Sequence, residues 1–313
     1  MIGSESQNPT PAQLIPISTL LGAPAGDLED LTAGTVALAG LYCDHFGGAE
    51  PGARLAARQI RYGCSHFART AWEGCARVGS NIIDIGDLNV FPLEPPKNFS
   101  ALTDQTVRIA ASGARLLAIG GDYSLTPALI AGLKSAGQSP SCVVRISQRL
   151  DLASADPQGD APGRDSSSRV ISECLDGGLS SMLFWGCAGR HALAEHELAN
   201  STTCVAGRSI EADPEHDLAL VREKVLAHSG SVFLSLDTDV LERRHLNSWP
   251  RRPTGEVTLL HLIEFLRALH GAEIVGGHLS GFIPRIATTQ WDATEGVVAI
   301  AREMAGLMQG EAR

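Results

Sequence analysis

Short apolar runs recur along the chain and alternate with segments that have helical spacing. Eight of these runs have the length of a β-strand and are continuously apolar, at residues 35–43, 81–86, 115–120, 142–147, 182–187, 203–207, 232–237 and 273–277. Continuous apolar runs of this length indicate strands of a parallel sheet that is buried on both faces. The pattern therefore predicts eight strands of one sheet.

The segments between the runs have the features of helices. Ser124 is expected to cap a helix that ends near Gly137, and Thr258 to cap a helix with leucines at helical spacing. A third helix is expected from Asp217 to His228. A repeated order of strand, helix and strand predicts one α/β domain with three layers, α/β/α, around a parallel sheet of about eight strands.

The domain is expected to span residues 34–313. Residues 1–33 are rich in Ser, Pro, Gly and Ala and contain one short apolar piece. We expect them to form an N-terminal arm that packs on the body or on a neighbouring subunit.

Two aspartates follow the run at 232–237. Asp237 and Asp239 are one residue apart, so in an extended chain they point the same way. Two carboxylates that leave a buried strand on one side need a cation, which could be a metal ion, an arginine or a substrate. The alternative is that Asp237 caps the strand while Asp239 lies in a solvated turn.

Composition narrows the class of protein. A net charge of −10 and a pI of about 5.4 argue against a surface for nucleic acid or an anionic membrane. No apolar run approaches the ~20 residues that cross a bilayer, and the polar start does not resemble a signal peptide. The seven cysteines form no CxxC pair. These features predict a reduced, cytoplasmic protein.

Several stretches resemble, in the correct order, the motifs of the arginase/agmatinase (ureohydrolase) family, and of its agmatinase-like branch in particular. They are GLYCDHFGGAEPGARLAARQIR (40–61), NIIDIGDLNV (81–90), AIGGDYSLTPALIAGL (118–133), VVRISQRLD (143–151), SLDTDVL (235–241) and GFIPRIATTQWDATEGVVAIA (281–301). The resemblance implies a single α/β/α domain that assembles as trimers or hexamers. It also implies two Mn²⁺ ions bridged by a hydroxide, which attacks a guanidino carbon so that urea is released.

The chain departs from the family at the metal ligands. Position by position, the resemblance assigns the ligand positions to Tyr123, Ser147, Arg149, Asp151, Asp237 and Asp239. Tyrosine, with a pKa of about 10, and serine are poor ligands for Mn²⁺ at neutral pH, and arginine cannot coordinate a metal. The glutamate that faces the guanidinium in the family corresponds to Gly281, and the histidine of its catalytic loop falls near Ser167.

These departures predict a degenerate metal site in which the chain supplies its own cation. We expect Arg149, with Arg145 as a second candidate on the same strand face, to form bidentate pairs with the surviving acids. The acids are Asp122, Asp151, Asp237 and Asp239. The alternative is that this cluster only holds the strand ends together. No cofactor is expected, except Mn²⁺ as a weak single ion on Asp151, Asp237 and Asp239.

The sequence leaves three functions open. The first is a pseudoenzyme that acts as a binding, regulatory or assembly subunit, as a homo-oligomer or with an intact homologue. The second is an enzyme with metal-independent chemistry on an amino-acid-derived or guanidino compound, and the third is a residual one-metal hydrolase of an amidine C–N bond. Pocket candidates in each case are Asp122, Arg145, Ser167, His278 and Gly281.

Overall fold

A computed structural model of the chain describes residues 18–44, 51–67, 78–91, 94, 96–148, 181–187, 202–206, 213–227, 230–242, 257–284 and 291–310. Arg149, Asp151 and Ser167 lie outside this part of the chain.

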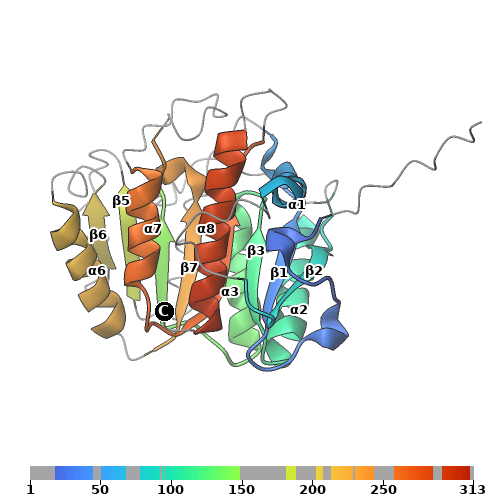
Figure 1. Cartoon of the computed structure of the whole chain (residues 1–313). Helices are drawn as coiled ribbons and strands as arrows, with labels where there is room; N and C mark the ends of the chain where they lie inside the picture. Colours follow the sequence, from blue (N-terminus) through green and yellow to red (C-terminus); the bar gives the residue numbers. More distant parts are fainter. Residues whose placement is uncertain are drawn as a thin grey trace, which may run out of the picture.

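All eight predicted strands are present in the described residues and form one sheet (Figure 1). They are β1 (Val36–Leu41), β2 (Ile82–Leu88), β3 (Arg115–Ile119), β4 (Cys142–Ile146), β5 (Ser181–Cys187), β6 (Thr202–Ala206), β7 (Val232–Asp237) and β8 (Ile274–Ser280). Their order is β2-β1-β3-β8-β7-β4-β5-β6, and every neighbouring pair is parallel. The predicted α/β fold with one parallel sheet is confirmed.

Helices cover both faces of the sheet, which gives the expected three layers (Figure 1). One face carries α1 (Ala56–Phe67), α6 (Pro214–Ala227), α7 (Leu259–Ala268) and α8 (Trp291–Gln309). The other carries α2 (Pro96–Ala111) and α3 (Thr126–Ser135). Two apolar cores form between the sheet and these layers, because the strand side chains alternate between the faces. Within the described residues, no helix is both long and apolar enough to cross a membrane.

The helix starts agree with the sequence only in part. Thr258 caps α7 as predicted, since its Oγ1 accepts a hydrogen bond from the backbone N–H of His261 at 3.1 Å. The prediction that Ser124 caps α3 is wrong. Asp122 caps a 3₁₀ turn, Tyr123–Leu125, that precedes the helix, and its Oδ1 accepts from the N–H of Ser124 at 2.9 Å. Ser124 lies inside this turn and its own amide and hydroxyl donate to Asp122, so its side chain does not cap α3.

Residues 18–33 pack against the body at the outer edge of β2. Ala25 forms a parallel bridge with Asp84, and the amide of Leu20 donates to Asp84 Oδ2 at 2.7 Å. Arg61 of α1 binds the same carboxylate with two nitrogens, Nε at 3.0 Å and Nη2 at 2.9 Å. Burial works against the charged arginine, but its hydrogen bonds to Asp84 and Asp87 raise the pKa of Arg61 above its ordinary value. These contacts cover an edge of the sheet that would otherwise be open to pairing.

Candidate functional site

The four central strands end side by side at one edge of the sheet. Because the order is β3-β8-β7-β4 and all are parallel, their carboxyl ends meet at the same place. These ends carry Asp122 after β3, Gly281 after β8, Asp237 at the end of β7 and Ser147 after β4. Ligands in open α/β sheets bind at this edge, so the predicted site lies where the fold favours one.

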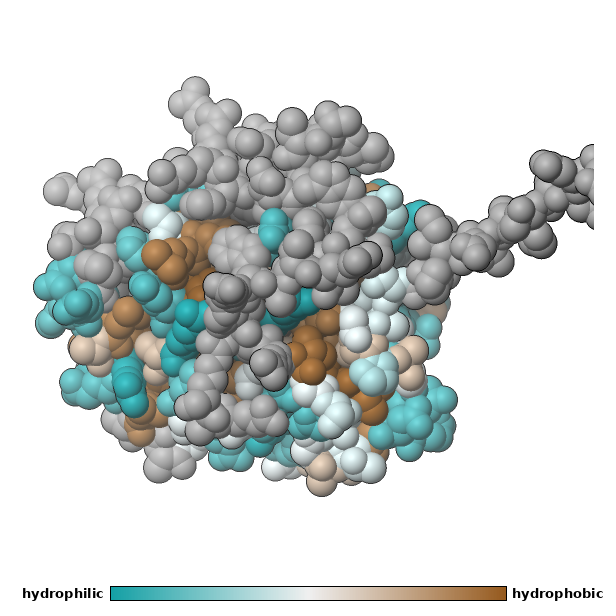
Figure 2. All heavy atoms as spheres, viewed as in Figure 1, coloured by the Kyte–Doolittle hydropathy of each residue, from teal (hydrophilic) through white to brown (hydrophobic). Residues whose placement is uncertain are grey.

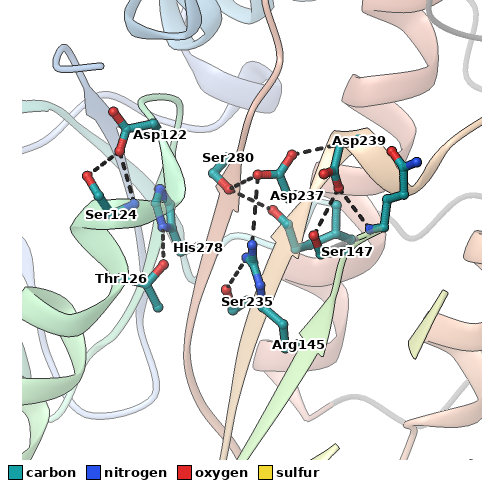
Figure 3. A network of polar contacts seen from close by, with 12 residues as sticks. Asp122, Ser124, Thr126, Arg145, Ser147, Ser235, Asp237, Asp239, His278 and Ser280 are labelled. Carbon is teal, nitrogen blue, oxygen red and sulfur yellow. Dashed lines mark hydrogen bonds and ion pairs between the residues drawn. The ribbon is translucent and has the colours of Figure 1, made fainter. Parts of the chain in front are cut away.

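Asp237 and Asp239 are both buried, with exposed fractions of 4% each. Asp239 lies in a short 3₁₀ turn, Thr238–Val240, and its amide donates to Asp237 Oδ1 at 3.0 Å. The sequence left two alternatives open, a cation site formed by both aspartates or a strand capped by Asp237 with Asp239 in a solvated turn. The structure combines parts of both, because Asp237 is a cap but Asp239 is buried (Figure 3).

Ser147 occupies a position that the resemblance assigns to a metal ligand. Its Oγ donates a hydrogen bond to Asp239 Oδ1 at 3.0 Å, and the amide of Gln148 donates to the same oxygen at 3.0 Å. A hydroxyl that donates in this way keeps its proton. Ser147 therefore stabilises the charge on Asp239 directly and has the role of a hydrogen-bond donor.

Arg145 is the buried cation of the described site. Its side chain is 4% exposed, Nη1 donates to Ser235 Oγ at 2.9 Å, and Nη2 lies 3.9 Å from Asp237 Oδ2 (Figure 3). The guanidinium also stacks over the ring of Tyr123, with 5.0 Å between Cζ and the ring centroid. The prediction that Arg145 points toward the aspartates agrees with this geometry. The expected bidentate pair is not what forms here, because Nη1 is directed to Ser235.

His278 is fully buried on β8, in register with Ser235 of β7. Its Nε2 lies 3.0 Å from the carbonyl oxygen of Gly120 and its Nδ1 lies 2.9 Å from Thr126 Oγ1. A carbonyl only accepts, so Nε2 carries the proton and Nδ1 accepts from the threonine hydroxyl. Burial, assisted by the charge of Arg145, lowers the pKa of His278 to about 4. Both ring nitrogens are engaged, and the predicted pocket residue is a neutral packing histidine.

Asp122 turns toward Ser124 in Figure 3, where both the amide and the hydroxyl of Ser124 donate to its Oδ1. Gly281 follows β8 with a φ of +81°, and its amide donates to the carbonyl of Gly121 at 3.1 Å. Predictions for Arg149, Asp151 and Ser167 fall outside the described residues.

Three partners in the site were not assigned a role from the sequence: Ser235, Ser280 and Thr126. Ser235 and Asp237 are two residues apart on β7, so the alternation of side chains along a strand places them on one face. This spacing could have identified Ser235 from the sequence. Ser280 pairs in register with Asp237, and its Oγ lies 3.5 Å from Asp237 Oδ2. Thr126 reaches His278 only through the packing of α3 on β8, which leaves no local signal.

Two of the four ligand positions among the described residues carry side chains that Mn²⁺ does not favour. The described ligand positions hold a phenol at Tyr123 and a proton-donating hydroxyl at Ser147, and the Asp237 carboxylate faces a guanidinium. Hard oxygen or imidazole ligands at each position are what such a centre needs. Within the part of the chain that the structure describes, no three His, Cys, Asp or Glu side chains are arranged to hold a metal.

Known structures share this fold. Proclavaminate amidino hydrolase from Streptomyces clavuligerus superposes with a TM-score of 0.78 at 21% identity, over 94% of this chain and 97% of the other. A hypothetical agmatinase from Burkholderia thailandensis gives a TM-score of 0.78 at 17% identity, over 93% and 90%. Formimidoylglutamase from Bacillus subtilis gives 0.75 at 16% identity, over 98% and 96%.

Comparison of the sequence with curated proteins gave no match. The family model described as the arginase family matches residues 34–306, which is most of the chain and includes all eight strands. This chain therefore belongs to the arginase family.

Proposed function

We propose that this chain is a divergent ureohydrolase homologue that does not hydrolyse guanidines by the dinuclear manganese mechanism, and that it acts as a binding, regulatory or assembly subunit. One observation carries the proposal. Arg145 lies buried with Nη2 3.9 Å from Oδ2 of Asp237, which is one of the positions to which the resemblance assigns a metal ligand.

Electrostatics explains why this pair opposes a metal. A divalent ion within coordination distance of Asp237 would lie close to the Arg145 guanidinium, and the two cations would repel each other. At an effective dielectric constant of about 20, charges of +2 and +1 that are ~5 Å apart repel by several kcal/mol. Ser235 and the Tyr123 ring hold the guanidinium on its other sides, so it cannot withdraw without losing those contacts.

The charge of the site supports a cationic ligand. Among the described residues at the strand ends, three carboxylates, Asp122, Asp237 and Asp239, and one guanidinium, Arg145, are buried. This excess of negative charge favours a small amino-acid-derived or guanidino compound. An agmatinase and an amidino hydrolase are among the similar structures, which agrees with that class of ligand.

Assembly and compartment are part of the same proposal. Membership of the family supports a trimer or hexamer, formed by this chain alone or together with an intact homologue. Cys64 and Cys142 are free and buried, which suits a reducing compartment such as the cytoplasm.

The test uses the purified full-length protein equilibrated with Mn²⁺ and then desalted. We expect no stoichiometric Mn²⁺ by elemental analysis and no urea from agmatine or arginine, while an intact agmatinase in the same assay releases urea. Calorimetric titration with agmatine is expected to give saturable binding. Two equivalents of retained Mn²⁺ with urea release would refute the proposal, and absence of agmatine binding would refute the ligand class.

A further inference from the structure

Gly281 and Asp237 come into close contact where β8 and β7 end. Gly281 follows Ser280, the last residue of β8, and Ser280 pairs in register with Asp237. A Cβ placed on Gly281 would lie 2.1 Å from Asp237 Oδ1 and 2.8 Å from Asp237 Cγ. Real Cβ atoms do not approach other heavy atoms this closely, so a side chain at 281 would force the carboxylate to move.

The Asp237 carboxylate is held where it is by three groups. Oδ1 accepts from the amide of Asp239 at 3.0 Å, and Oδ2 lies 3.5 Å from Ser280 Oγ and 3.9 Å from Arg145 Nη2. An aspartate side chain is short, so it cannot turn away from residue 281 and keep all of these contacts. Loss of the contact with Arg145 would leave two buried charges without their mutual compensation.

We propose that Gly281, Asp237 and Arg145 form an interlock, in which the absence of a side chain at 281 keeps Asp237 in the orientation that faces Arg145. Gly281 is thus a positioning residue. The inference rests on the proposed function and deepens it, because it explains what keeps the Asp237 carboxylate beside Arg145. Position 281 cannot supply a ligand-facing carboxylate while Asp237 pairs with Arg145.

The contrast between two glycines separates this effect from backbone strain. Gly281 and Gly137 both have positive φ, +81° and +77°, so alanine is strained at either position. At Gly137, however, no heavy atom of the described residues lies within 4 Å of the added Cβ. We expect Gly281→Ala to lower the melting temperature of the full chain by ~2–4 °C or more beyond the loss caused by Gly137→Ala.

A second background tests the mechanism. In the variant Arg145→Met/Asp237→Ala, which removes both charges and the carboxylate, Gly281→Ala is expected to cost no more than Gly137→Ala. If Gly281→Ala alone does not fold, folding of the triple variant supports the interlock, and failure of the triple variant while its parent folds overturns it. The interlock is also wrong if the two alanine variants lose equal stability in the native background, or if the extra loss persists without Asp237.

These outcomes are independent of the test of the proposed function. Metal-dependent urea release would refute the proposed function and would leave the comparison of Gly281→Ala with Gly137→Ala in the two backgrounds unchanged. If Gly281→Ala costs the same stability with and without the Arg145 and Asp237 side chains, the interlock is refuted, whatever the urea assay gives.

Discussion

The guanidinium of Arg145 and the carboxylate of Asp237 lie 3.9 Å apart, Nη2 to Oδ2, and both side chains are almost fully buried. β4 and β7 are neighbours in the sheet, and Arg145 pairs in register with Ser235, two residues before Asp237. The cation is therefore fixed by the sheet itself. This differs from a long surface arginine, whose position is set by solvent and rotamer freedom.

Arg145→Met is expected to destabilise the protein by about 3 kcal/mol, because it leaves the Asp237 carboxylate buried without its cation. The double variant Arg145→Met/Asp237→Asn should recover part of this loss, since no unpaired charge remains. Chemical denaturation of the two single variants and the double variant gives the coupling free energy. Lys97→Met is the control, because its pair with Glu94 is exposed and should contribute less than about 1 kcal/mol. Zero coupling between Arg145 and Asp237 would contradict the structure of the site.

Because of His278, the free energy of unfolding should decrease as the pH is lowered from about 6.5 to about 4. Its folded-state pKa is lowered to about 4, so in this range the unfolded chain binds a proton that the folded chain does not. The neutral His278 ring makes its full contribution to the free energy of unfolding above the ordinary histidine pKa of 6.5. This contribution is about 3 kcal/mol, since each pKa unit corresponds to 1.36 kcal/mol.

Unfolding free energies measured from pH 7 to pH 5 test this expectation. His278→Asn should lose the part of the slope that arises from the histidine, whereas His216→Gln, at an exposed position on α6, should keep it. An unchanged slope in His278→Asn would show that the ring is not held neutral by the fold.

Asp84 should control the attachment of residues 18–33. Its buried carboxylate accepts from the Leu20 amide and from two nitrogens of Arg61, so Asp84→Ala removes the anchor of the segment and leaves Arg61 without its main partner. We expect a loss of about 3 kcal/mol and faster hydrogen exchange at the Leu20 amide.

Asp87→Ala is the matched control, because Asp87 binds the same arginine but is 48% exposed. It should cost less than about 1 kcal/mol and leave exchange at Leu20 unchanged. Equal effects of the two substitutions would contradict the role of Asp84.

Much of the fold follows from the sequence because a parallel sheet buries both faces. Continuous apolar runs such as 232–237 can be recognised without knowledge of their neighbours, and β7 has these bounds. The shared parity of Arg145 and Ser147 on one strand also predicted that Arg145 lies on the face that points to the aspartates. These signals are local, so one chain segment contains them.

The remaining features depend on contacts between distant segments. The approach of Gly281 to Asp237 requires the register of β8 on β7, and the bond from Thr126 to His278 requires the packing of α3. The cap at Ser124 was predicted wrongly because the chain forms a 3₁₀ turn after β3, in which Asp122 is the cap and the hydroxyl of Ser124 donates to it. Sequence spacing does not contain this information.

The hydroxyl of Ser147 should be required at its position, because it donates to the buried Asp239 Oδ1 at 3.0 Å. Ser147→Ala removes a donor to that oxygen and is expected to cost about 1–3 kcal/mol. Ser147→Asp should cost more at pH 7, because it places a carboxylate against Asp239. The like charge raises the pKa of the new carboxyl, so the stability of this variant relative to Ser147→Ala should improve as pH falls from 7 to 5. Denaturation at both pH values checks this, and a Ser147→Asp variant as stable at pH 7 as the unmodified protein would show that the site accepts a second carboxylate.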